Sequence, residues 1–211
     1  MTTAREAILS TVRTALGRGP LDDAGREALD QRQPAHTRPA IDEDLVERFV
    51  RKFESRAGTV ARVAALSDVP AAVEAHRARW QLPQRAAVGA ALGELPWPEG
   101  WKIHHQRAAI TEALSVSPCI AGIAETGSLM LASGPGSPAT HNYVPDDHVI
   151  VLERSRIVRH FEDAWALLRA RDGGMPRATN IISGPSRTAD VEQTVQLGAH
   201  GPRRVLVVLV G

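Results

Sequence analysis

Two stretches rich in glycine and hydroxyl groups hold the residues of this sequence best suited to binding an anion. The first, GIAETGSLMLASGPGS, covers residues 122–137 and contains one carboxylate, Glu125. The second, SGPSRT, covers residues 183–188 and contains one arginine, Arg187. Glycine lets a backbone approach a ligand closely, while hydroxyls, free N–H groups and arginine donate hydrogen bonds to carboxylates and phosphates. We therefore expect the two stretches to be two walls of one anion-binding site.

The second stretch lies where a predicted strand, residues 178–183, meets a predicted helix, residues 186–198, with Val191 and Val195 facing the core. The beginning of a helix offers free N–H groups and partial positive charge, and open α/β sheets bind ligands beyond the carboxyl ends of strands. A capped helix after a tight turn would explain the same residues without a ligand. The ligand-binding residues expected here are Ser183, Gly184, Pro185, Ser186, Arg187 and Thr188.

Glu125 comes shortly before a predicted strand, SLMLAS, at residues 128–133. A carboxylate there can be a nucleophile, a general base or a structural acceptor for backbone N–H groups, and the sequence leaves these roles open. Neither stretch matches a Walker lysine loop or the spaced glycines of a dinucleotide-binding fingerprint. We take Glu125 as the candidate catalytic residue and expect Thr126, Gly127 and Ser128 to bind the ligand.

The histidines and the one cysteine argue against a metal site in this chain. His104 and His105 are adjacent, so they would face opposite ways on a strand, and no HExxH spacing occurs. His141 and His148 lie near the first stretch, where we expect ordinary hydrogen bonding or exposure to solvent. Cys119 excludes an internal disulfide and an iron–sulfur cluster held by this chain alone. We expect Cys119 to be a small buried hydrophobe in a reducing, cytoplasmic setting.

The composition limits the classes of partner. The chain has 211 residues, of which 43% are hydrophobic and 23% charged, and this balance is typical of one globular domain with an appendage. A formal net charge of +1 predicts no general attraction to nucleic acid or acidic membranes. The longest apolar run, VLVVLVG at residues 205–211, has the length of a strand, so no membrane span is expected.

Residues 1–40 are predicted to be an N-terminal helix and a linker arm that precede the main domain, residues 41–211. Thr3 and Glu6 form a capping-box pattern, and Ile8, Val12 and Leu16 then follow helical spacing. Residues 18–40 carry three prolines, many charges and little periodicity, which indicates a loose arm. The amphipathic helix needs an apolar partner, either its own domain or another chain.

The main domain alternates apolar strands with amphipathic helices. Helices are predicted over residues 41–58, 67–80, 155–173 and 186–198. Strands are predicted over residues 59–63, 85–90, 128–133, 148–153, 178–183 and 204–210. Continuous apolar strands separated by helices favour an α/β fold with a mostly parallel sheet that is covered on both faces.

Several runs of this chain resemble the LUD-domain family, in particular its lactate utilization protein C group. The resemblance is carried by GIAETGSLML, VPDDHVIVLERSRIV and NIISGPSRTADVEQTVQLGAHGPRRVLVVLV, and it covers roughly the last 100 residues strongly. It implies a three-layer α/β sandwich similar to the sugar-isomerase and CoA-transferase fold. It also implies a role with two partner proteins in oxidising L-lactate to pyruvate, in which the partners, not this chain, hold iron–sulfur clusters.

Two functions therefore stay open. In the first, the chain is an accessory subunit that binds a small carboxylate or an organic cofactor and docks on iron–sulfur partners. In the second, it is a self-sufficient enzyme that acts on an acyl or phosphorylated small molecule. CoA-transferases of this architecture form an acyl-enzyme link through a glutamate before a glycine-containing turn, and Glu125 occupies a similar position although its turn reads ETG. The family resemblance favours the first function.

Overall fold

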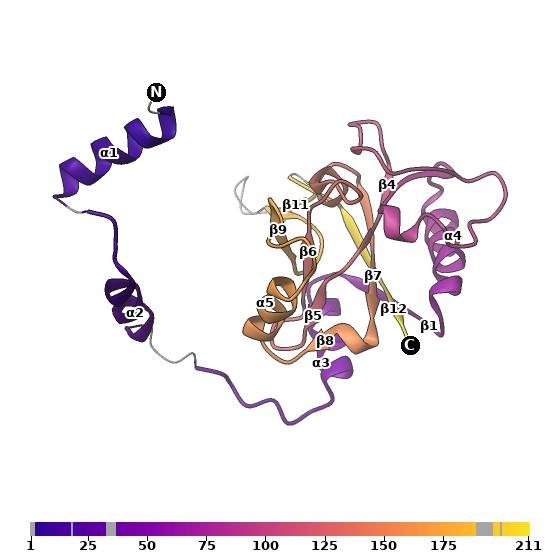
Figure 1. The fold of residues 1–211 in the computed structure, drawn as a ribbon. Coiled ribbons are helices and arrows are strands. Elements are labelled where there is room, and N and C mark those ends of the chain that lie inside the picture. Colours follow the sequence, from indigo (N-terminus) through magenta and orange to yellow (C-terminus); the bar gives the residue numbers. More distant parts are fainter. Residues whose placement is uncertain (1–2, 18, 33–36, 189–195, 199) are drawn as a thin grey trace. The chain divides into compact units, whose positions relative to one another are not determined.

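The computed structural model describes residues 3–17, 19–32, 37–188, 196–198 and 200–211. The chain divides into two compact units, Met1–Arg38 and Pro39–Gly211 (Figure 1). In the first unit, helix α1 (Ala4–Leu16) begins with the predicted capping box and ends at Gly17, which adopts a left-handed conformation. The predicted loose arm contains a second helix, α2 (Asp23–Gln31), which the prolines around it obscured.

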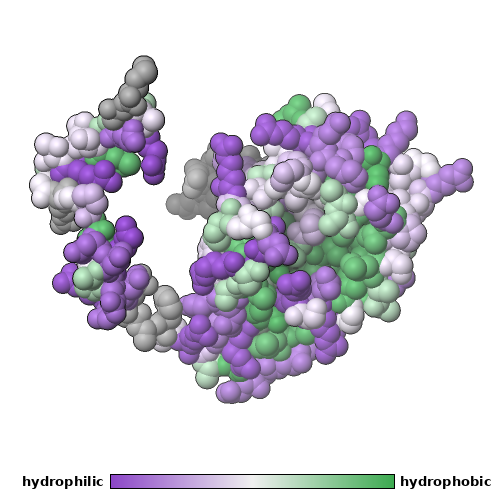
Figure 2. Space-filling view, viewed as in Figure 1, coloured by the Kyte–Doolittle hydropathy of each residue, from purple (hydrophilic) through white to green (hydrophobic). Residues whose placement is uncertain are grey.

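Neither helix of the first unit buries a side chain. On α1, Ile8, Val12 and Leu16 are 64%, 47% and 63% exposed, so the apolar stripe predicted from their spacing is open to solvent. Figure 2 shows hydrophilic and apolar residues side by side on this unit.

A six-stranded parallel sheet forms the centre of the second unit, in the order β1-β12-β7-β4-β2-β3. Its strands are β1 (Thr59–Val63), β2 (Arg85–Val88), β3 (Lys102–His104), β4 (Leu114–Pro118), β7 (Asp147–Glu153) and β12 (Arg204–Val210). β7 and β12 are apolar on both faces and almost wholly buried, as central parallel strands must be. The predicted α/β sandwich around a mostly parallel sheet is confirmed.

Different elements cover the two faces of this sheet (Figure 1). Helix α4 (Val69–Trp80) packs Val69 and Val73 on one face. Helix α3 (Leu45–Glu54) packs Phe49 and Phe53 on the other face, together with a second sheet that the sequence did not predict. The second sheet has the order β8-β5-β6-β9, and its strands are β5 (Ala121–Ile123), β6 (Ser128–Ala132), β8 (Ile157–Val158) and β9 (Thr179–Ile182).

Helix α5 (Phe161–Arg169) covers the second sheet through Ala164 and Leu168. The predicted helix over residues 155–173 is therefore wrong in its first turns. The β-branched pair Ile157 and Val158 forms β8 beside β5 instead, and the helix begins only after His160, whose backbone N–H donates to the Asp163 carboxylate.

The predicted helix over residues 186–198 is also wrong where the structure describes it. Strands β10 (Arg187–Thr188) and β11 (Gln196–Leu197) pair antiparallel. The Gly198 N–H donates to the Ser186 carbonyl at 3.0 Å, which closes the ladder at its open end. The expected core residues Val191 and Val195 lie outside the described residues. Within the described residues, Arg187 and Thr188 pair with Leu197 and Gln196 in a ladder instead of beginning a helix.

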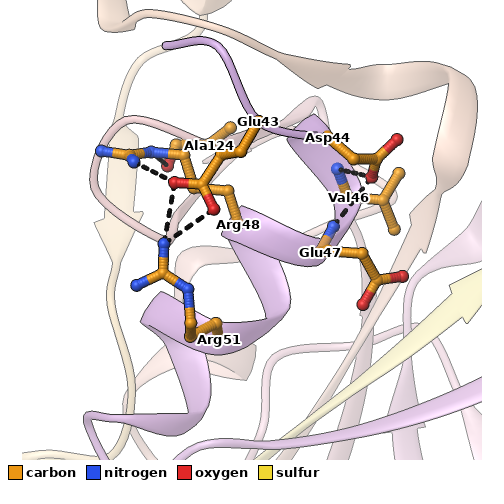
Figure 3. A network of polar contacts seen from close by, with 7 residues as sticks. All are labelled: Glu43, Asp44, Val46, Glu47, Arg48, Arg51 and Ala124. Carbon is orange, nitrogen blue, oxygen red and sulfur yellow. Dashed lines mark hydrogen bonds and ion pairs between the residues drawn. The ribbon is translucent and has the colours of Figure 1, made fainter.

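Two other helices begin later than predicted. α3 begins after Asp44, whose carboxylate accepts hydrogen bonds from the Val46 and Glu47 N–H groups (Figure 3). A short 3₁₀ turn, Leu66–Asp68, occupies the start of the helix that was predicted over residues 67–80. In the part of the chain that the structure describes, no helix is both long and apolar enough to cross a membrane.

Candidate functional site

The structure brings the two glycine-rich stretches together through neighbouring strands of the second sheet. β6 and β9 pair antiparallel, with Leu129 opposite Ile182. The residues just before and after this pair, Ser128 and Ser183, share a hydrogen bond of 2.6 Å between their hydroxyls. The Thr126 hydroxyl donates to the Ser128 hydroxyl at 2.8 Å. A short chain of three hydroxyls therefore links the ETGS turn to the SGPS loop.

Gly127 and Gly184 both rest against the end of α3. Gly127 has a φ of +69°, and an added Cβ would lie 2.8 Å from backbone atoms of Lys52 and Phe53. Gly184 has a φ of +132°, and an added Cβ would lie 2.8 Å from the Arg56 carbonyl oxygen. These glycines are thus needed for the left-handed backbone and for close packing of both loops on one helix. From the sequence, these glycines were instead expected to let the backbone approach a ligand closely.

Glu125 lies in the tight connection between β5 and β6. Its Oε2 is 3.3 Å from Nδ1 of the buried His160, which precedes α5, and its backbone N–H donates to the Arg159 carbonyl at 3.0 Å. The Glu125 side chain is 25% exposed. The turn is also fixed from the other side, because Arg48 Nε donates to the Ala124 carbonyl at 3.1 Å.

The Arg48 guanidinium is itself held by a carboxylate (Figure 3). Glu43 accepts hydrogen bonds from Arg48 and, at 2.8 and 2.9 Å, from Arg51. Hydrogen bonds from the two guanidinium groups hold the pKa of the Glu43 carboxyl below its usual value. This network connects the start of α3 to the residue before Glu125, so it positions the ETGS turn.

A cavity of about 300 Å³ lies beside the SGPS loop. Four of the predicted residues line it: Ser183, Gly184, Ser186 and Arg187. The other lining residues are Asn142, Tyr143, His148, Ile181, Ile182, His200, Gly201, Pro202 and Val205. The remaining predicted residues, Glu125, Thr126, Gly127, Ser128, Pro185 and Thr188, are not among them, and the Thr188 side chain lies outside what the structure describes.

The cavity adjoins the amino ends of the central strands. His148 and Val205 are the second residues of β7 and β12. Ser183 and Gly184 follow the carboxyl end of β9, but β9 belongs to the second sheet. The site was expected beyond the carboxyl ends of parallel strands at a helix N-terminus, and the structure has neither feature here.

The charge of the lining favours an anion. Arg187 carries a full positive charge and is exposed, and no carboxylate occurs among the described residues that line the cavity. The hydroxyls of Ser183 and Ser186 add further polar groups to the lining, whereas the Tyr143 hydroxyl already donates its hydrogen to Asn180 Oδ1. A small carboxylate or phosphate fits this chemistry better than a cation does.

His148 is the cavity residue that sequence reasoning valued too little. It is fully buried, and its Nε2 lies 3.0 Å from the Ser117 hydroxyl. Burial, with a smaller contribution from the nearby His141, lowers the pKa of His148 to about 3, so its ring is neutral at physiological pH. The signal in the sequence was a histidine directly before the apolar run VIVL of this strand. Asn142, Tyr143 and His200 carried no such signal.

Nothing among the described residues resembles a metal site. No group of three or more histidine, cysteine, aspartate or glutamate side chains gathers in a metal-binding arrangement in that part of the chain. His104 contacts Glu112, and His105 contacts the Val88 carbonyl. Burial raises the pKa of the Cys119 thiol to about 12, so Cys119 behaves as the unreactive hydrophobe that was expected.

Comparison with known proteins gives three findings. The family model described as the LUD domain matches residues 102–210, just over half of the chain. An uncharacterized protein of Neisseria meningitidis serogroup B is 40% identical over 89 residues, and lactate utilization protein C of an Exiguobacterium species is 34% identical over 105 residues. A DUF162 family protein of Deinococcus radiodurans, solved at 1.70 Å, superposes with a TM-score of 0.59 at 18% identity.

The extent of these matches differs. The aligned segments cover 42% and 48% of this chain but only 38% and 46% of the Neisseria and Exiguobacterium proteins. The Deinococcus structure covers 82% of this chain and is itself covered completely. The structural match therefore supports the fold of nearly the whole second unit, while the sequence matches concern less than half of each relative.

Proposed function

Because the chain belongs to the LUD domain family, we propose that it takes part in lactate utilization as a cytoplasmic subunit that binds a small carboxylate. The role in lactate utilization is proposed because several relatives are named lactate utilization protein C. The choice of a carboxylate as the ligand is supported by the cavity lined by Ser183, Ser186 and Arg187. This cavity offers hydrogen-bond donors and positive charge, and no carboxylate occurs among its described lining residues.

Partners are part of the proposal because of the redox chemistry. Oxidation of L-lactate to pyruvate releases two electrons, which must leave the substrate for an acceptor. The single cysteine cannot ligate an iron–sulfur cluster by itself. We propose that two partner proteins, at least one of them an iron–sulfur protein, receive the electrons, and that this chain supplies the carboxylate-binding site.

A binding experiment tests the ligand part. Calorimetric titration of the full chain with L-lactate should show saturable binding, and Arg187→Ala should weaken it about tenfold or more because a charge-assisted hydrogen bond is lost. Arg169→Ala is the matched control, since Arg169 is exposed on α5 and does not line the cavity. Equal affinity of the two variants would remove Arg187 from the site.

A reconstitution experiment tests the partner part. The chain is purified at native expression level, and the proteins that accompany it are identified. Lactate-dependent reduction of a dye should require this chain and its partners together. Turnover by this chain alone would contradict the proposed subunit role.

The alternative, acyl or phosphate transfer through a covalent bond to Glu125, gains no support from the geometry. Glu125 does not line the cavity, and its Oε2 is 3.3 Å from the His160 ring rather than directed at an open ligand site. The role of Glu125 can be tested independently of the cavity, as described below.

A further inference from the structure

His148 has one nitrogen with a partner and one without. Its Nε2 contacts the Ser117 hydroxyl at 3.0 Å, whereas Nδ1 is buried with no hydrogen-bond partner among the described residues. The ring lines the cavity and is fully buried. An unpaired polar atom in a buried side chain is costly, so its presence beside a cavity calls for a ligand group.

The neighbours of Ser117 determine which nitrogen of His148 carries the proton. The Ser117 hydroxyl donates to Oδ1 of Asn142 at 3.4 Å, and a carbonyl oxygen can only accept. When the single hydrogen of Ser117 is assigned to Asn142, Ser117 accepts from His148. Nε2 is therefore protonated, and in the neutral ring Nδ1 is a bare acceptor.

A second buried polar group without a hydrogen-bond partner among the described residues adjoins the cavity through its contact with the lining residue Tyr143. Asn180 is 7% exposed, its Oδ1 accepts a hydrogen bond from the Tyr143 hydroxyl, and its Nδ2 has no partner. Asn180 is two positions before the lining residue Ile182 on β9, so the two side chains share a face. The cavity region thus pairs a buried acceptor with buried and exposed donors.

We propose that His148 is the specificity-determining residue of this cavity, and that its Nδ1 accepts a hydrogen bond from the hydroxyl of a 2-hydroxy acid. This inference rests on the proposed carboxylate site. Arg187 and the serine hydroxyls bind the carboxylate, while His148 forms a hydrogen bond only when the adjacent carbon carries a hydroxyl group. A 2-keto acid has only an acceptor at that carbon, so it leaves Nδ1 unpaired. The cavity consequently prefers L-lactate to pyruvate.

The first measurement is the tautomer of His148. The full chain is labelled with ¹⁵N-histidine, and the His148 signals are assigned by their absence in His148→Gln. At neutral pH, Nδ1 should have the chemical shift of an unprotonated nitrogen, and addition of L-lactate should shift it. A protonated Nδ1 would overturn the proposal even if every ligand bound.

The second measurement compares affinities for L-lactate, pyruvate and propionate, the last of which lacks any group at the second carbon. L-Lactate should bind about tenfold or more tightly than the other two. Equal binding of L-lactate and pyruvate, or tighter binding of pyruvate, would overturn the role of His148 and leave the carboxylate site standing. No binding of any of the three would overturn the proposed function itself.

Variants separate recognition from folding. His148→Phe keeps the ring shape without the acceptor and should abolish the preference for L-lactate. If His148→Phe does not fold, Ser117→Ala serves, because it releases Nε2 and so frees the choice of tautomer. Ser115→Ala is the matched control: Ser115 is equally buried on β4, but its hydroxyl donates to the His141 carbonyl. A preference that survives Ser117→Ala and is lost in Ser115→Ala would contradict the proposal.

Discussion

Asp147 and His148 are consecutive on β7, yet they face two regions that differ in how their polar groups are satisfied. On the α4 face, the fully buried Asp147 accepts two hydrogen bonds from Arg204, at 2.7 and 2.6 Å, and contacts His76 at 2.8 Å. On the opposite face, Nε2 of the equally buried His148 contacts Ser117, and its Nδ1 has no partner within the part of the chain that the structure describes.

The difference separates a structural polar cluster from a candidate binding site. A buried charge that is fully paired stabilises one arrangement of the chain, and Asp147 keeps no free acceptor toward the cavity of about 360 Å³ that its partners His76 and Arg204 line. A buried neutral group that keeps a free acceptor beside a cavity is complementary to something from outside. Both clusters lie at the same end of the same strand, so burial alone does not distinguish them; only the hydrogen-bond inventory does.

Removing the Asp147 carboxylate should have the largest effect. Asp147→Ala removes the carboxylate that pairs with the buried His76 and with Arg204, whose side chain is 32% exposed, so the free energy of unfolding should fall by about 3 kcal/mol in urea denaturation. Asp146→Ala is the control, because the Asp146 side chain is 55% exposed and should cost less than about 1 kcal/mol. Similar losses in the two variants would mean that the cluster does not stabilise the fold.

Acid should distinguish His148 from its neighbour. The pKa of His148 is about 3 in the fold and near its ordinary 6.5 when unfolded, so its stabilising contribution is present above pH 6.5 and is lost as pH falls toward 3. Between pH 7 and pH 4 the wild type should lose about 3 kcal/mol of unfolding free energy that His148→Gln does not lose.

A control variant and a comparison with Asp147 show whether this loss is specific to His148. Replacement of the exposed His200 by Gln should leave the acid-dependent loss unchanged. Asp147 behaves differently: burial would raise its pKa, but hydrogen bonds from Arg204 and His76 outweigh burial and keep the pKa below its ordinary value. The contribution of Asp147 is therefore present above about pH 4 and is lost only below it.

Gly127→Ala tests whether α3 supports the loops of the candidate site. The added methyl group meets the α3 backbone in addition to the strain of a positive φ, so we expect a loss of about 2 kcal/mol in unfolding free energy. Gly173→Ala has a comparable φ of +85° but no atom within 4 Å, so it measures the conformational strain alone and should cost about 1 kcal/mol. Equal costs would show that contact with α3 contributes nothing.

Glu125→Gln should have the smallest effect. The side chain is partly exposed and lies outside the cavity, so carboxylate affinity should change less than about twofold. Incubation of the wild type with acyl-CoA, followed by peptide mass spectrometry, should find no adduct on Glu125. An adduct that disappears in Glu125→Gln would instead favour the self-sufficient transfer enzyme.

Four of the six strands of the parallel sheet could be predicted from the sequence, mainly because they contain apolar runs, whereas β3 and β4 were not predicted. HVIVLE and RVLVVLV admit few other structures, and the four predicted strands 59–63, 85–90, 148–153 and 204–210 all lie in the central sheet. The second sheet could not be predicted equally well. Its strands β5 and β8 are only three and two residues long, and they depend on pairing with each other across 33 intervening residues of chain.

The candidate site, like the fold, could be predicted from the sequence only in part. The adjacency of Ser128 and Ser183 was expected from residue types, and the structure places them in hydrogen-bond contact. The placement of Glu125 outside the cavity depends on His160 and on the short β8 before it, neither of which has a local signature. His148 becomes informative only when it is known that its Nε2 contacts Ser117 on β4 and that its Nδ1 has no partner among the described residues.

Gly127 lies against the backbone of Lys52 and Phe53 in the last turn of α3, and Gly184 lies against the Arg56 carbonyl just after the helix, so residues 52–56 support both the ETGS turn and the SGPS loop. A displacement of this segment would carry both loops in the same direction and preserve the contact between their serines. Substitutions that shift residues 52–56 should therefore move both loops together and leave the contacts between the loops unchanged.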